Sequence, residues 1–186
     1  MTKVFIIENN IYQTIKNNIL PKNIIERVSK YKTEKDYINS FVAWNYLLKI
    51  LEEEYNIINP IIYENDYHKP FIEGINFNIS HSNNLIAVAI SKENVGIDIE
   101  MVNSIKDLSL IKQKIFDDVN IDDETLIKKW TKIEAKFKYD GSGIIYSKIN
   151  NLEINDIETI KIHDSNNCLY YLSIKSKEEN EFIFVH

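Results

Sequence analysis

Two acidic side chains, Asp98 and Glu100, have the type and spacing that most clearly suggest chemistry in this sequence. They lie in residues 95–100, where apolar and acidic side chains alternate in a pattern typical of a strand. Because side chains alternate between the two faces of a strand, both carboxylates share one face. At about 6.6 Å apart they repel each other by roughly 2 kcal/mol at an effective dielectric constant near 20. A cation bound between them would turn this cost into a metal site.

A third acidic group, Glu134, lies four residues before Lys138 in a segment with helical periodicity. This spacing places both side chains on one face of a helix. Considered alone, the two residues are most simply an exposed ion pair on a solvated helix face. Gly141 and Gly143 follow the helix and allow the backbone to come close to a ligand. Beside the acidic strand, these features favour a functional site over a surface ion pair.

The rest of the chain supplies strands and long helices that could position these groups. Capping residues and helical periodicity predict helices over residues 22–30, 34–56 and 122–140. Alternating and β-branched residues predict strands over residues 3–8, 61–63, 77–80, 85–91 and 95–100, with further strand-like segments within 151–185. The simplest arrangement of the segment between residues 77 and 100 is three adjacent antiparallel strands. The order of elements favours two lobes of similar size that share a groove.

The composition is that of an ordinary globular protein, with 186 residues, 44% hydrophobic residues and 27% charged residues. The net charge of −6 argues against nucleic-acid binding, which needs a basic field. Cys168 is the single cysteine, so the chain cannot form an internal disulfide. No apolar stretch has the length of a signal peptide or a membrane span. We therefore expect a cytoplasmic protein that does not bind membranes.

Several short motifs occur together in one order between residues 68 and 143. They are His68-Lys69-Pro70, Asn78-Ile79-Ser80-His81-Ser82, Val95-Gly96-Ile97-Asp98-Ile99-Glu100, and Trp130-Thr131-x-x-Glu134-Ala135-x-x-Lys138-x-x-Gly141-x-Gly143. Each motif alone is weak, but the ordered set resembles the 4′-phosphopantetheinyl transferases. About ninety residues precede the Gly-Ile-Asp motif, which favours the longer, surfactin-synthetase-activating type over the short trimeric type.

The resemblance implies an α+β fold of two pseudo-dimeric lobes, each with a small antiparallel sheet packed on a long helix. We expect an N-terminal lobe over residues 1–102, a C-terminal lobe over residues 103–186, and a monomer. The implied reaction transfers 4′-phosphopantetheine from coenzyme A to a serine of an apo acyl or peptidyl carrier protein and releases adenosine 3′,5′-bisphosphate. Such carriers serve polyketide, nonribosomal peptide or fatty acid biosynthesis, and the sequence does not distinguish these pathways.

The resemblance also assigns roles to particular residues. Asp98, Glu100 and Glu134 would bind Mg²⁺, with Mn²⁺ as an alternative metal. The catalytic residues would be Glu134, Lys138 and Asp98, with Glu134 accepting the serine proton directly or through water. Contacts to coenzyme A would come from Lys69, Ser80, His81, Arg27, Lys30 and Ser40. Taken alone, a histidine such as His81 is more simply a core or turn residue, and only its motif favours phosphate binding.

The sequence departs from the family pattern at three positions. Family members usually carry a basic residue directly before the helix glutamate, where this chain has Ile133. They often have lysine between the two glycines and arginine in the first long helix, where this chain has Ser142 and Asn39. Loss of three basic contacts would weaken coenzyme A binding by about two orders of magnitude or more. Two alternatives therefore stay open: a family member that binds carrier or coenzyme A without efficient transfer, and an acidic domain with neither activity.

Overall fold

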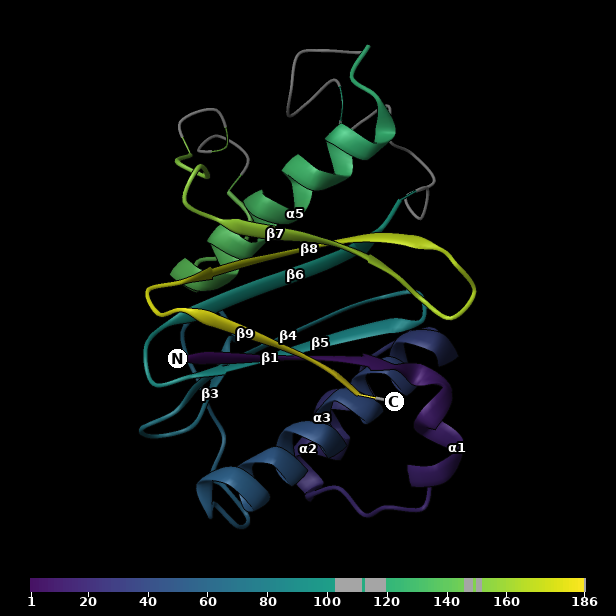
Figure 1. Cartoon of the computed structure of the whole chain (residues 1–186). Helices are drawn as coiled ribbons and strands as arrows, with labels where there is room; N and C mark the ends of the chain where they lie inside the picture. Colours follow the sequence, from purple (N-terminus) through teal and green to yellow (C-terminus); the bar gives the residue numbers. More distant parts are fainter. Residues whose placement is uncertain (103–111, 113–119, 146–148, 150–151, 186) are drawn as a thin grey trace.

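The computed structural model describes residues 1–102, 112, 120–145, 149 and 152–185 (Figure 1). It is a mixed α and β fold with two main sheets and two long helices. In chain order the elements are β1 (Thr2–Glu8), η1 (Asn9–Ile11), α1 (Tyr12–Ile15), α2 (Lys22–Val28), α3 (Glu34–Tyr55), β2 (Tyr63–Glu64), β3 (Pro70–Phe71), β4 (Asn76–Ser82), β5 (Leu85–Ser91), β6 (Val95–Met101), α5 (Asp123–Asp140), β7 (Glu158–His163), β8 (Leu169–Ser176) and β9 (Asn180–Val185).

The two long helices begin and end where their capping residues predict. The Thr33 side chain accepts a hydrogen bond from the backbone of Asp36 at the start of α3. Asp122 does the same for Thr125 at the start of α5, with an oxygen to nitrogen distance of 2.8 Å. Gly141 ends α5 with a φ of +66°, a conformation that favours glycine. The predicted long helices are thereby confirmed to within a residue or two.

The strands form one four-stranded sheet in the order β4-β5-β1-β9 and one three-stranded sheet in the order β6-β8-β7. All neighbours in both sheets are antiparallel except β1 and β9, which are parallel. The expected small antiparallel sheets with packed helices are therefore present. Of the three adjacent strands expected between residues 77 and 100, β4 and β5 do pair antiparallel. The expectation was wrong for β6, which pairs with β8 in the other sheet.

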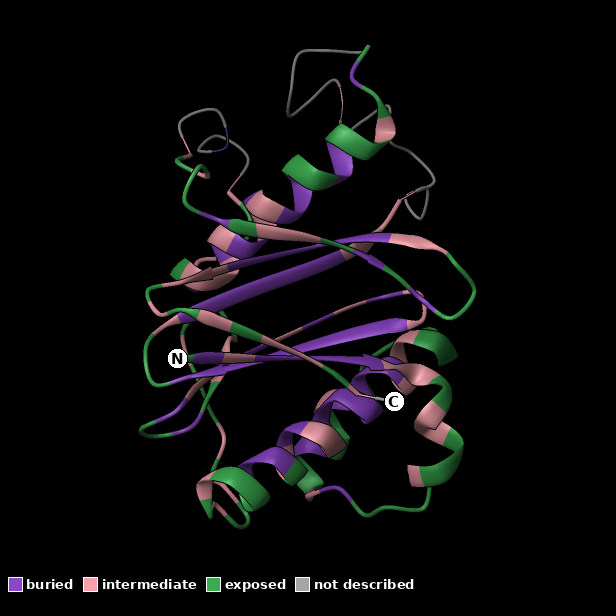
Figure 2. Cartoon of the chain, in the orientation of Figure 1, coloured by how far each residue is buried: buried purple, intermediate pink, exposed green. Residues whose placement is uncertain are grey.

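The layers follow one another as α3, the four-stranded sheet, the three-stranded sheet and α5 (Figure 1). One apolar core lies between α3 and the four-stranded sheet, and it includes Trp44, Leu47 and Val88. A second core fills the space between the two sheets, where Ile97 and Leu172 are completely buried. Figure 2 shows the same pattern, with buried strands in the middle of the molecule. The alternating apolar residues of β6, Ile97 and Ile99, therefore face the core between the two sheets.

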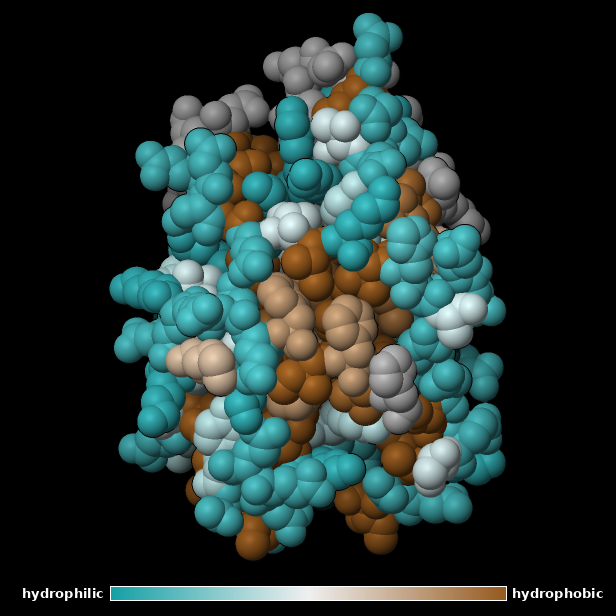
Figure 3. Space-filling model, in the orientation of Figure 1, coloured by the Kyte–Doolittle hydropathy of each residue, from teal (hydrophilic) through white to brown (hydrophobic). Residues whose placement is uncertain are grey.

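The predicted division into lobes at residue 102 stays a prediction, and it falls at the edge of a range outside the described residues. Two strands pair across this division in the chain, since β6 joins β8 and β9 joins β1. Figure 3 shows apolar side chains gathered in the middle of the face on which β9 lies. Within the described residues, no helix is long and apolar enough to cross a membrane.

Helix α5 lies directly on strand β6 at Gly96. A Cβ atom at this position would be 2.2 Å from the carbonyl oxygen of Ala135 and 2.2 Å from the amide nitrogen of Tyr139. Both atoms belong to the backbone of α5, so neither can rotate away as a flexible side chain would. The glycine therefore allows the close approach that brings the side chains of α5 to those of β6.

We expect Gly96→Ala to lower the free energy of unfolding by about 3 kcal/mol or more, because overpacking against two backbone atoms must move the helix. Urea unfolding measures this loss. Gly74→Ala is the control, because Gly74 has a φ of +79° but nothing within 4 Å of the added Cβ. It should lose only the strain of the left-handed conformation, about 1–2 kcal/mol. A Gly96→Ala loss no larger than that of the control would contradict the close-packing explanation.

Candidate functional site

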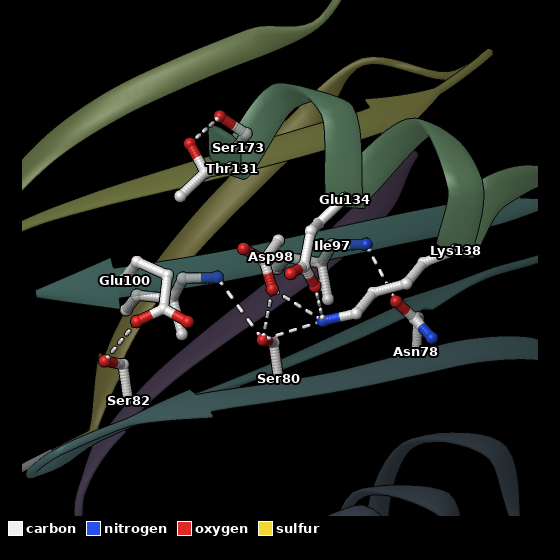
Figure 4. A network of polar contacts seen from close by, with 11 residues as sticks. Asn78, Ser80, Ser82, Ile97, Asp98, Glu100, Thr131, Glu134, Lys138 and Ser173 are labelled. Carbon is white, nitrogen blue, oxygen red and sulfur yellow. Dashed lines mark hydrogen bonds and ion pairs between the residues drawn. The ribbon is translucent and has the colours of Figure 1, made fainter. Parts of the chain in front are cut away.

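The site is built where strand β6 lies beside strand β4. Ser80 of β4 donates a hydrogen bond to the Asp98 carboxylate of β6 at 2.8 Å, and Ser82 donates to Glu100 at 2.7 Å. Figure 4 shows these serines below the two carboxylates, with α5 above them. Each acidic side chain is therefore held by a serine on the neighbouring strand, which fixes its direction.

Helix α5 contributes Glu134 and Lys138 to the same place. The Lys138 Nζ atom lies 2.6 Å from Asp98 Oδ1, 3.0 Å from Ser80 Oγ and 3.8 Å from Glu134 Oε2 (Figure 4). Asp98 is only 2% exposed. The simpler interpretation of Glu134 and Lys138 as a surface pair is therefore incomplete, because the ammonium group also neutralises a buried aspartate on another element.

Burial and charge shift the proton equilibria of the helix residues. Burial first, and then the nearby Asp98 carboxylate, raises the pKa of Glu134 to about 8. Burial alone would lower the pKa of Lys138, but the carboxylates of Asp98 and Glu134 together raise it above its ordinary value. Lys138 therefore stays charged at neutral pH, whereas the carboxyl group of Glu134 is poised to exchange a proton there.

The acidic residues have the donor chemistry of a magnesium site. The Asp98 Oδ2 atom is buried and has no hydrogen-bond partner within the described part of the chain. A buried carboxylate oxygen without a partner is costly, and a cation would satisfy it. Among the described residues, no three acidic, histidine or cysteine side chains converge closely enough to hold a metal by themselves. Mg²⁺ takes a few carboxylates together with water and substrate oxygens, so binding of Mg²⁺ by Asp98, Glu100 and Glu134 stays a prediction.

A groove of about 330 Å³ opens over these residues. All the predicted site residues except Lys30 and Lys69 line it, and they come from α2, α3, β4, β6 and α5. A second groove of about 290 Å³ adjoins it, and both are lined by Pro70, Asn78, Glu134 and Lys138. The fold therefore brings side chains as far apart in the chain as Arg27 and Lys138, 111 positions, into one groove.

Two predicted coenzyme A contacts lie outside the first groove. Lys30 is exposed just after α2. The Lys69 Nζ atom lies 3.0 Å from the carbonyl oxygen of Val95 and 3.5 Å from that of Tyr139, and burial lowers the pKa of Lys69 to about 8. Lys69 thereby ties its loop to β6 and to the end of α5. Its predicted contact with phosphate stays a prediction.

Two other predicted contacts line the groove but already have partners. Arg27 forms an ion pair with Glu64, and its guanidinium carbon lies 6.0 Å from the centre of the Trp44 ring. His81 packs edge-on against Tyr31 with ring centres 5.8 Å apart. Burial lowers the pKa of His81 below its ordinary value, so its neutral form is favoured at pH 7. A bound phosphate would oppose this shift.

Two of the three departures from the family pattern point away from the grooves. Asn39 is buried, where its amide donates to the carbonyl oxygen of Asn83 at 2.9 Å. Ile133 packs in an apolar cluster with Trp130 and Phe137 and lines neither groove. Ser142 lines neither groove. Asn39 and Ile133 therefore have structural roles here. The expectation that these three positions weaken coenzyme A binding stays a prediction.

Asn78 and Ser82 were not among the predicted site residues, although both belong to a quoted motif. Asn78 lines both grooves, and Ser82 holds Glu100 from beneath. The signal that could have identified them is the polar residue at every second position of a buried strand, since polar groups buried in a strand need partners.

Comparison with curated proteins gives a match that covers most of the chain. A curated protein of Aneurinibacillus migulanus, named 4′-phosphopantetheinyl transferase gsp, is 30% identical over 165 residues, which cover 82% of this chain and 68% of that protein. No family model matches the chain.

Proposed function

Since the chain belongs to the 4′-phosphopantetheinyl transferase superfamily, we propose that it transfers 4′-phosphopantetheine from coenzyme A to a serine hydroxyl of an apo carrier protein. The observation that carries this proposal is the cluster of Asp98, Glu134 and Lys138 in one groove. Acidic groups that suit Mg²⁺ lie there beside an ammonium group that pairs with the buried Asp98, and phosphoryl transfer needs both.

The proposed reaction forms a bond between the carrier serine Oγ and the phosphorus atom that bears the pantetheine arm. The pyrophosphate P–O bond to the adenosine side breaks, and adenosine 3′,5′-bisphosphate leaves with that electron pair. Glu134 takes the proton of the serine hydroxyl, for which a carboxyl group with a pKa near 8 is well matched to neutral conditions.

The remaining residues of the groove bind and orient the substrate. Lys138 supplies a charged donor for the negative charge that develops on the phosphate oxygens. His81, Arg27 and Ser40 line the same groove on its α2 and α3 side, where they can contact the nucleotide end. Asp98, Glu100 and Glu134 would hold Mg²⁺, which when bound neutralises the pyrophosphate and makes it a better electrophile.

The partner is proposed to be an apo acyl or peptidyl carrier protein. The chain carries a net charge of −6, and carrier proteins are often acidic, so long-range electrostatic attraction cannot bring them together. Docking must then depend on local contacts beside the groove. The biosynthetic pathway that the protein serves is then set by which carrier protein fits the surface beside the groove.

The test is incubation of the protein with coenzyme A, Mg²⁺ and a panel of apo carrier proteins, followed by intact-protein mass spectrometry. The expected result is the addition of one phosphopantetheine group to at least one carrier and no addition when a chelator removes the metal. Modification of no carrier, while a reference transferase modifies them all, would refute transfer. Calorimetric binding of coenzyme A without any transfer would instead identify a binding protein.

A further inference from the structure

Strands β4 and β6 are edge strands of different sheets, yet they lie side by side in the centre of the molecule. In the described chain, β4 pairs with β5 and β6 pairs with β8, and no backbone ladder joins β4 to β6. The outer N–H groups of β6 are buried and need acceptors. The way in which they are satisfied shows how the two sheets are joined.

Side chains of β4 take the place of the missing backbone ladder. The Asn78 Oδ1 atom accepts from the Ile97 amide at 2.8 Å, and the Ser80 Oγ atom accepts from the Ile99 amide at 3.3 Å. The Ser82 Oγ atom accepts from the Met101 amide at 3.1 Å. We call these three β4 side chains the polar ladder. Because polar residues recur at every second position of β4, they meet every second amide of β6 in register.

The polar ladder also bears on the carboxylates. The hydroxyl groups of Ser80 and Ser82 each accept from a β6 amide and donate to the adjacent carboxylate. Each hydroxyl thus holds both a backbone amide of β6 and the acidic side chain of the residue before that amide.

Ser82 is the member of the polar ladder that can be tested most cleanly. It is 6% exposed, and it lines neither groove, unlike Asn78 and Ser80. In the described part of the chain, the hydroxyl of Ser82 forms hydrogen bonds with the Glu100 carboxylate and the Met101 amide. Any effect of Ser82 on the site must therefore pass through Glu100 or the backbone of β6.

We propose that Ser82 is a positioning residue that orients the Glu100 carboxylate for a divalent cation. This inference rests on the proposed function, in which Glu100 is a metal ligand. The hydroxyl donates to Glu100 Oε2 and so favours one orientation of this carboxylate, which lines the groove. Without the hydroxyl, the cation loses this contribution to the orientation of its ligand.

The experiment measures Mn²⁺ binding by calorimetry in the absence of coenzyme A and carrier. Removal of a residue that orients a metal ligand typically costs 10–100-fold in affinity, so we expect Ser82→Ala to weaken Mn²⁺ binding by about tenfold. Ser82→Thr keeps the hydroxyl and should bind close to wild type. Thermal unfolding without metal shows whether each variant is folded.

Ser91→Ala is a matched control. Ser91 is also a buried strand serine that accepts from a backbone amide, that of Glu93, and donates to a carboxylate, that of Glu178. This substitution removes the same two kinds of hydrogen bond, and a third from the Thr2 hydroxyl, at a residue that lines neither groove. It should lower stability at least as much as Ser82→Ala and leave Mn²⁺ affinity unchanged.

A double-mutant cycle tests whether Ser82 acts through Glu100. In a Glu100→Ala background, Ser82→Ala should cause no further loss of Mn²⁺ affinity. Independent, additive losses would overturn the proposal, as would wild-type affinity in Ser82→Ala or an absence of Mn²⁺ binding by the wild type. Mn²⁺ binding that depends on Ser82, together with a failure to modify any carrier, would refute the transferase proposal and leave the positioning role standing.

Discussion

Replacing Glu134 by glutamine is expected to reduce turnover by about 10²- to 10⁴-fold, the usual contribution of a general base. Glutamine keeps the shape of the side chain but cannot take a proton from the carrier serine. Because burial first, and then Asp98, raises the pKa of Glu134 to about 8, the free protein favours the neutral carboxyl group at pH 7, whereas a bound cation would favour the carboxylate that accepts the serine proton. Glutamine resembles this form, so the variant should fold with undiminished stability.

Steady-state phosphopantetheine transfer and thermal unfolding measure the two parts of this prediction. Glu124→Gln is the control, because Glu124 lies on the same helix and contacts Lys161 and Tyr171 outside the grooves. It should retain wild-type turnover. Wild-type turnover in Glu134→Gln would show that another group accepts the proton.

Replacing Lys138 by methionine is expected to lower the free energy of unfolding by about 3–5 kcal/mol, the cost of leaving a buried charge unpaired. The Lys138 ammonium group lies 2.6 Å from Asp98, which is 2% exposed and has Glu134 as a further acidic neighbour. Methionine fills similar space but provides no charge. Transfer activity should fall as well, because the same ammonium group is proposed to stabilise phosphate charge.

Denaturant unfolding provides the measurement, and Lys136→Met provides the comparison. Lys136 also pairs with an aspartate, Asp140 of α5, but that carboxylate is 36% exposed, and exposed pairs contribute about 0–1 kcal/mol. Adding Asp98→Asn to Lys138→Met should recover part of the lost stability, since the unpaired charge is then gone. A Lys138→Met variant as stable as Lys136→Met would contradict the proposed burial of this ion pair.

The sequence predicted the helices and most strands because these depend on local signals. Thr33 and Asp122 are strong caps, and Gly141 is a strong stop, so both long helices could be placed before the structure was known. The pairing of β4 with β5 is also local, but strand partners far apart in the chain could not be predicted in this way. The partner of β6 is β8, which comes much later in the chain, and the choice depends on the core that the two sheets form.

In the candidate site, too, some features could be predicted from local sequence and others depend on the fold. Asp98 and Glu134 could be identified from residue type and spacing, and the structure brings them into one groove. The polar ladder could not be predicted, because a serine in a motif gives no indication of which backbone amide it accepts from. The role of Lys69 was equally hidden, since its carbonyl partners come from a strand and a helix end that meet only in the fold.

The most direct test follows the two halves of coenzyme A separately during the reaction. Coenzyme A labelled in the pantetheine arm and coenzyme A labelled in the adenosine are each incubated with the protein, Mg²⁺ and an apo carrier. The proposed chemistry predicts that the pantetheine label moves to the carrier serine while the adenosine label leaves in equal amount as adenosine 3′,5′-bisphosphate. Neither label on any carrier, or both labels together on one, would contradict cleavage of the pyrophosphate by this site.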